Sequence, residues 1–162
     1  MTANDVLAAG YRMSAQLFHR MVDDLTPEEF NKQPVSGANC AAWVVGHLAM
    51  VLRNSARRMG ATNLPEIPNE VTTKLKATRQ PAGEQCGYGD PKSLLAVFDA
   101  SLERFVVAIR ALPAEALTAA SDISVPFPTN RAEAIQFGAL HIAMHTGQLS
   151  TIRRSLGKPP LV

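Results

Sequence analysis

The chain has 162 residues, of which 46% are hydrophobic and 19% are charged, and its formal net charge is +2. This composition excludes a disordered chain, and no run of about 18 apolar residues is present to span a membrane. A charge this small also argues against a nucleic-acid-binding protein, which concentrates its basic residues on one face. We expect residues 1–162 to form a single domain.

Two further features bear on the compartment in which the protein works. The N-terminal segment has no basic start followed by an apolar core, which argues against a secretory signal. Cys40 and Cys86 form neither a C-x-x-C motif nor a metal-ligand spacing, and they suit free thiols in a reducing compartment. We therefore expect a cytoplasmic protein.

Four long helices are expected, and the first two occupy the N-terminal half of the chain. The first runs from about Asn4 to Leu25 along one apolar stripe with a period of 3.6 residues, and a capping-box turn follows it at residues 26–30. The second is expected to begin at an N-cap on Asn39 and to end at Gly60, which suits a left-handed C-terminal cap.

The other two long helices also carry boundary signals. The third begins with Asp90 as N-cap and ends before Pro113, and the fourth runs from an N-cap at Asn130 to Gly157. Strand signals are scarce, because prolines interrupt the one extended candidate, residues 122–128. The sequence predicts an all-α protein, a four-helix bundle.

The connection between the second and third helices is unusually long. About thirty residues, rich in proline and glycine, separate Gly60 from Asp90, and residues 70–77 have the composition of a short helix. A connection of this length permits a crossover, so the second and third helices need not be antiparallel neighbours.

The stretch HIAMHTGQL contains the strongest functional signal. His141 and His145 are four residues apart, so their side chains project side by side from the fourth helix. We expect this face, and the neighbouring stripe that contains Leu140 and Met144, to lie inward. Buried imidazoles need partners for their ring nitrogens. For this pair alone, hydrogen-bonded packing and metal binding explain the spacing equally well.

A third histidine favours metal binding. His47 lies in the most apolar segment of the chain, AAWVVGHLAMVL, on the second helix. Three inward-facing histidines from two helices fit a metal site inside a bundle, and Gly46 and Gly138 would let the two helices approach closely. His19 falls on the polar side of the first helix, and we expect it to be a surface residue outside the site.

Three nitrogen ligands without a fourth protein ligand indicate an open coordination position, which is typical of catalytic rather than structural sites. Imidazole suits Zn, Ni, Cu or Fe, and of these we expect Zn or Ni. A peptidase is excluded, because Ile142 stands where a zinc peptidase has its glutamate base. The sequence identifies no catalytic residue.

These motifs resemble the DinB-like (YfiT-like) superfamily of four-helix metalloproteins. The resemblance rests on W-x-x-x-H from Trp43 to His47, on HIAMHTGQL, and on the tail IRRSLGKPP. It implies a divalent metal ion held by His47, His141 and His145, and a homodimer. It also implies a metal-dependent transferase or isomerase that uses a low-molecular-weight thiol, such as bacillithiol, mycothiol or glutathione, on a small electrophilic substrate. Relatives often carry an acidic residue after the second-helix histidine, and residues 48–60 contain none.

Gln148 and Asn54 are the candidates to accept a hydrogen bond from the outward N–H of a metal-bound histidine. Cys40 lies about two helical turns before His47, too far away to bind the same ion. Arg53, Arg57 and Arg58 form the densest basic cluster, and the sequence leaves open whether they border a pocket for an anionic substrate or face solvent.

Two other functions fit the same residues. The first is a metal-binding stress-response protein without catalysis. The second is a structural or interaction module whose histidines are simply packed.

Overall fold

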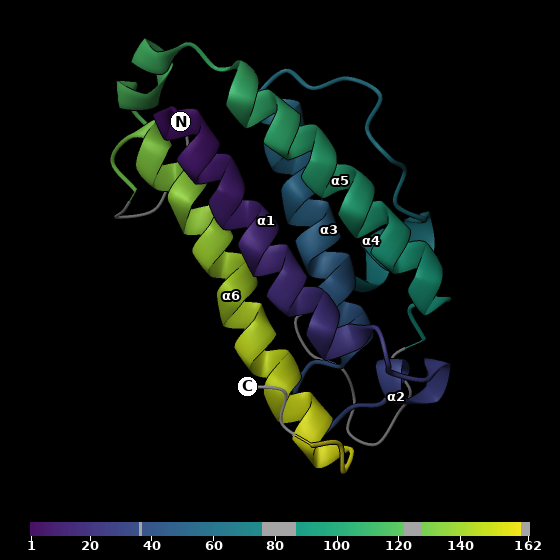
Figure 1. The fold of residues 1–162 in the computed structure, drawn as a ribbon. Coiled ribbons are helices and arrows are strands. Elements are labelled where there is room, and N and C mark those ends of the chain that lie inside the picture. Colours follow the sequence, from purple (N-terminus) through teal and green to yellow (C-terminus); the bar gives the residue numbers. More distant parts are fainter. Residues whose placement is uncertain (36, 76–86, 122–127, 160–162) are drawn as a thin grey trace.

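The structure, a computed structural model, describes residues 1–35, 37–75, 87–121 and 128–159. These residues form an all-α fold, as the sequence predicts, and they contain no strand, only an isolated bridge between Ala120 and Asn130. Within the same residues, no helix is long and apolar enough to cross a bilayer. The long helices, which lie side by side in Figure 1, are α1 (Ala3–Val22), α3 (Ala41–Arg58), α5 (Pro91–Ala111) and α6 (Arg131–Ser155). The short ones are α2 (Pro27–Asn31), α4 (Asn69–Leu75) and the 3-10 helix η1 (Ala114–Thr118).

Side-chain caps determine where most of the helices begin. Thr26, Asp90 and Asn130 each accept a hydrogen bond from the backbone N–H three residues later, which confirms the three predicted caps. α3 differs from the prediction, because Cys40 and not Asn39 is its N-cap. The Cys40 Sγ accepts a hydrogen bond from the Trp43 N–H at 3.4 Å. An N-cap side chain accepts from an N–H two or three residues later, and Asn39 lies four residues before Trp43.

α1 and α6 pack against each other and run in the same direction. The Tyr11 hydroxyl of α1 donates a hydrogen bond to the Ile135 carbonyl of α6 at 2.8 Å. Further along both helices, Arg153 Nη1 donates to the Met21 carbonyl at 3.1 Å. The same guanidinium pairs with Asp24 just beyond α1, so the two helices are joined near both ends.

α3 and α5 form the second closely packed pair, and their C-terminal ends lie together, where Met59 and Leu112 line a shared cavity. Asn4 at the start of α1 donates to the Leu112 carbonyl at 2.8 Å, so α1 and α6 run opposite to α3 and α5. Because α3 and α5 are successive long helices that run in the same direction, the chain between them must return along the length of the molecule. The long segment from Gly60 to Asp90 provides it, and α4 in this segment confirms the predicted short helix.

The two glycines of the predicted close approach face other helices. A Cβ atom at Gly46 would meet Val71 and Leu75 of α4 at 3.4–3.5 Å, and a Cβ at Gly138 would lie 1.9 Å from the Tyr11 hydroxyl of α1. The expectation that they bring the two histidine-bearing helices together is therefore wrong. Gly46 instead allows α4 to pack against α3, and Gly138 leaves space for the Tyr11 hydroxyl.

Two further expectations are corrected. Leu140 and Met144, which we expected to lie inward, are 53% and 62% exposed. Each is two residues from the buried Ile142, which places it about 200° around the helix from that side chain.

Cys40 is disulfide-bonded, so the expectation of a free thiol is wrong at this position. One of the observations behind a reducing compartment is thereby removed. Cys86 and most of the proline-interrupted segment 122–128 lie outside the described residues.

His19 lies outside the cluster of the other three histidines, as expected, but it is more than a surface residue. Its Nδ1 is 2.9 Å from an Asp23 carboxylate oxygen, and its Nε2 is 2.8 Å from an Asp99 oxygen on α5. Burial lowers the pKa of His19, but the hydrogen bonds and charges of the two carboxylates outweigh burial and raise the pKa. When it is protonated, the imidazole can donate to both carboxylates and join α1 to α5.

This bridge predicts a pH-dependent part of the stability. Because the pKa of His19 is raised in the folded protein, the contribution is complete below the unfolded pKa of about 6.5 and is lost as the pH rises through the folded value. We expect His19→Gln to lower the unfolding temperature at pH about 5.5 and to change it little at pH about 8.5. An equal loss at both values in thermal melts would contradict the bridge.

Candidate metal centre

The Nε2 atoms of three histidines converge on one point between α3 and α6. Nε2 of His141 lies 3.0 Å from Nε2 of His145 and 3.4 Å from Nε2 of His47. One ligand atom from each ring lies within 4.8 Å of the others, and the three residues together could hold a metal ion. The structure therefore brings together all three histidines that the sequence singled out.

Helix geometry explains this convergence. His141 and His145 are one turn apart on α6, and α3 crosses their face in the opposite direction with His47 near its middle. His145 is only 7% exposed, whereas His47 and His141 are half-buried. The cluster is thus covered on one side and accessible on the other.

All three histidines are less basic than a free imidazole. Burial, with smaller contributions from the neighbouring His145 and His141, lowers the pKa of His47 to about 4. Burial is also the largest cause that lowers the pKa values of His141 and His145. The cluster is therefore neutral at pH 7, with imidazole lone pairs available as ligands.

Neutral rings in this arrangement can satisfy one another only in part. A neutral imidazole has one N–H and one acceptor nitrogen. When all three rings carry the proton on Nδ1, the three Nε2 atoms are acceptors and repel. When His141 carries it on Nε2, this N–H can donate to one of the other two Nε2 atoms. A cation at their centre would use all three lone pairs at once, and packing with one Nε2–H···Nε2 hydrogen bond is the alternative.

Gln148 determines which nitrogen of His145 carries the proton. Its Oε1 lies 2.9 Å from His145 Nδ1. With the amide oxygen as acceptor, Nδ1–H donates the hydrogen bond, and Nε2 keeps its lone pair toward the other two rings. This contact matches the role that the sequence suggested for Gln148.

Loss of this contact should weaken metal binding. We expect Gln148→Leu to lower the affinity for zinc by about 10–100-fold, because the His145 ring loses the partner that fixes its orientation and tautomer. Gln136→Leu is the matched control, since Gln136 is also exposed on α6. Competition titrations with a fluorescent zinc chelator measure both affinities. Equal affinities in the two variants would assign Gln148 no part in the site.

Aromatic rings flank the cluster. The Trp43 ring stacks on His47 with centroids 4.8 Å apart and an interplanar angle of 7°. Phe137 lies parallel to His141 at a centroid distance of 6.4 Å. Trp43 is one helical turn before His47, so the W-x-x-x-H spacing gives this stack. It restricts rotation of the His47 ring.

Other residues considered from the sequence lie outside the cluster. Asn54 accepts a hydrogen bond from Arg57 at 3.2 Å, and the described residues show none between it and a histidine. Ile142 is buried in the core. No Cys, Asp or Glu within the described part of the chain joins the three histidines. A metal ion held by them would keep an open coordination position.

A comparison with protein families identifies the superfamily of this chain. The family model of the DinB superfamily matches residues 11–149, a range that includes all three histidines. The chain belongs to the DinB superfamily. The DinB resemblance inferred from the sequence motifs is therefore confirmed.

A solved structure shares this DinB fold. The crystal structure of a conserved protein from Enterococcus faecalis superposes with a TM-score of 0.75 at 18% identity, covering 98% of this chain and 99% of that one. At this identity the likeness supports the fold alone. A comparison with curated proteins gives no match.

Proposed function

We propose that this DinB protein is a metalloprotein that binds one divalent ion, zinc or nickel, through His47, His141 and His145. The observation that supports it most is the convergence of three neutral Nε2 atoms. Ligand nitrogens about 2.0–2.1 Å from a tetrahedral zinc ion lie about 3.3 Å apart. The separations of 3.0 and 3.4 Å lie on either side of that value.

We further propose that the protein is a metal-dependent transferase or isomerase that uses a low-molecular-weight thiol on a small electrophile. The open ligand position and the two half-buried histidines support this proposal, since a reactant needs access to the ion. When bound, the ion supplies Lewis acidity, which lowers the pKa of a thiol at the site. The histidines hold the ion, Gln148 orients His145, and Trp43 restricts His47.

The absence of a neighbouring carboxylate favours a thiol. Among the described residues, no Asp, Glu or Cys joins the histidines, so the chain offers no general base beside the open position. A thiol ionises more easily than water and needs less help from a base.

A direct assay tests this activity. Zinc-loaded protein is mixed with 1-chloro-2,4-dinitrobenzene and, in turn, with glutathione, bacillithiol and mycothiol. The thiolate sulfur replaces chloride on the ring, which releases HCl and forms a coloured thioether. We expect faster turnover with at least one thiol, and loss of this excess in His141→Ala. Bound metal without turnover for any thiol or electrophile would favour the non-catalytic stress-response protein instead.

The remaining proposals concern the whole molecule. We propose that the four long helices of this single domain form a four-helix bundle in a cytoplasmic homodimer. Large apolar side chains that are 43–65% exposed support dimer formation: Val6, Met13 and Leu17 on α1, and Leu140 and Met144 on α6. In sedimentation experiments, we expect Met13→Glu combined with Leu140→Glu to convert a dimer into a monomer. A wild-type monomer would contradict the proposal.

A further inference from the structure

A cavity of about 260 Å³ lies between α3, α5 and α6, at the end of the molecule where α3 finishes and α6 begins. Phe105 and Ile135, both buried, form an apolar floor, and Arg58 and Arg131 add two guanidinium groups. Within the described residues, no histidine of the metal centre lines it. The cavity is therefore a separate feature of the fold.

Neither guanidinium has a carboxylate partner among the described residues. Elsewhere Arg12 pairs with Glu103, and Arg153 pairs with Asp24. Among the described residues, Arg58 donates only to the Ser55 hydroxyl, at 3.3 Å, and both residues line the cavity. Two cations beside one small apolar space leave a site that an anion would complement.

Helix electrostatics does not account for both arginines. Arg58 is the last residue of α3, where a positive charge is favourable. Arg131 is the first residue of α6, where the helix dipole disfavours a positive charge. The capping of α6 uses Asn130 and Glu133 and does not involve the Arg131 side chain. An anion between the two guanidinium groups would be favourable for both.

The cavity lies on the side of α3 and α6 that carries the metal centre. Ala134, which lines it, is seven residues before His141 on α6, two helical turns or about 10 Å. On α3, Arg58 is eleven residues after His47, three turns or about 16 Å. Both helices therefore place the cavity at the same end relative to the histidines.

We propose that Arg58 and Arg131 bind the carboxylate of a small organic anion with an apolar body. The apolar floor favours an organic anion over an inorganic one, since the floor would otherwise stay in contact with water.

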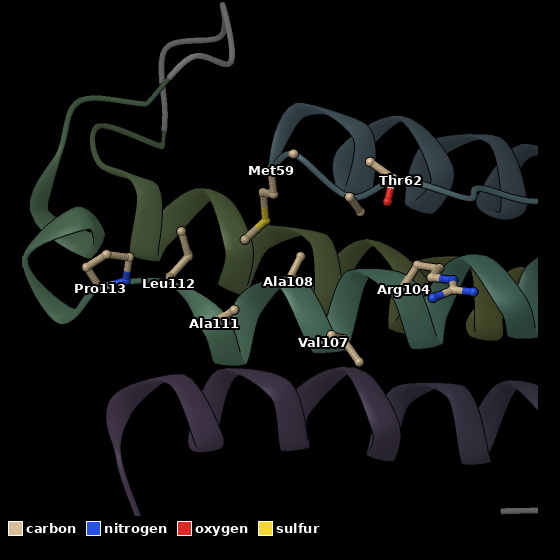
Figure 2. Close-up of a pocket in the computed structure, with 10 residues that line it drawn as sticks. Met59, Thr62, Arg104, Val107, Ala108, Ala111, Leu112 and Pro113 are labelled. Carbon is tan, nitrogen blue, oxygen red and sulfur yellow. The ribbon is translucent and has the colours of Figure 1, made fainter.

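A second hollow nearby supplies a matched control. It lies on the α5 side of Met59 and Leu112, which line both spaces, and Figure 2 shows Arg104 at its opposite end. Arg104→Gln removes the same charge outside the proposed site. Arg58→Gln combined with Arg131→Gln removes both guanidinium groups inside it.

Benzoate and its neutral isostere benzamide are the probes, titrated into metal-free protein and followed by amide NMR shifts. We expect benzoate to shift the amides of Gly60, Ala134 and Ile135, and to bind at least about tenfold more tightly than benzamide. The double variant should lose about tenfold or more in affinity, and Arg104→Gln should not. The wild-type protein alone can overturn the proposal: benzoate and benzamide would bind with equal affinity, or the shifted amides would lie elsewhere.

The same titration separates this proposal from the metal site. In His141→Ala, we expect benzoate binding to be unchanged. If wild-type protein binds no metal but still binds benzoate at Arg58 and Arg131, the proposed function fails and the anion site stands. If metal binds and benzoate does not, the anion site fails and the metal function stands.

Discussion

Zinc at about one hundred times its Kd should stabilise the metal-free protein by about 2.7 kcal/mol, because the ion binds the folded chain. For a chain of this size, the unfolding temperature should rise by about 5–10 °C. The reason lies in the site: three neutral imidazoles present Nε2 to one point, where a cation can use their lone pairs together. Differential scanning fluorimetry at pH about 7.5 measures the shift.

Two histidine variants test whether this stabilisation comes from zinc bound at the three-histidine cluster. His141→Ala removes the ring that lies within 3.4 Å of both other Nε2 atoms, and it should abolish the shift. His19→Gln also removes a histidine but leaves the cluster intact, so its shift should equal that of the wild type. An undiminished shift in His141→Ala would place zinc elsewhere on the protein.

Gly138→Ala should destabilise the fold by about 2–4 kcal/mol, because the new methyl group overpacks the core and displaces a buried hydroxyl. Its Cβ would lie 1.9 Å from the Tyr11 hydroxyl oxygen. The Tyr11 ring is 2% exposed and lies edge-on to Phe105, so it has little room to move. Movement would also cost its hydrogen bond to the Ile135 carbonyl.

Gly147→Ala is the control for helix propensity. Gly147 lies in the same helix, and a Cβ there would meet nothing within 4 Å. Alanine should stabilise this position by about 0.5–1 kcal/mol. Tyr11→Phe should recover part of the loss in Gly138→Ala, because it removes the atom that clashes. Urea unfolding measures all three, and similar stabilities for the two alanine variants would contradict this packing.

Local signals predicted much of this fold. Asp90, Asn130 and Thr26 are caps because a side-chain oxygen accepts from an amide three residues later, which depends on a few neighbouring residues alone. The meeting of His47 with His141 was also predictable, since each ring lies on the inward face of its helix. The i, i+4 spacing then directs the His145 ring to the same point.

Features that depend on which helices become neighbours could not be predicted. Gly138 packs on Tyr11 because α1 and α6 run in parallel, and no local signal specifies that direction. The pairing of His19 with Asp99 likewise joins residues eighty positions apart.

The approach of Arg58 to Arg131 depends on helix arrangement in the same way. It requires the end of α3 to meet the start of α6, which follows from the crossover between α3 and α5. The sequence pattern on each helix is the same whether or not the two residues meet.

The most direct test of the metal site is the metal content of the purified protein. The wild type and His141→Ala are prepared without an affinity tag or chelator and measured by plasma mass spectrometry. The account predicts about one zinc or nickel ion per wild-type chain and a background level in the variant. No metal in either protein, even after zinc and nickel are added, would contradict it and leave the three histidines as a packing feature.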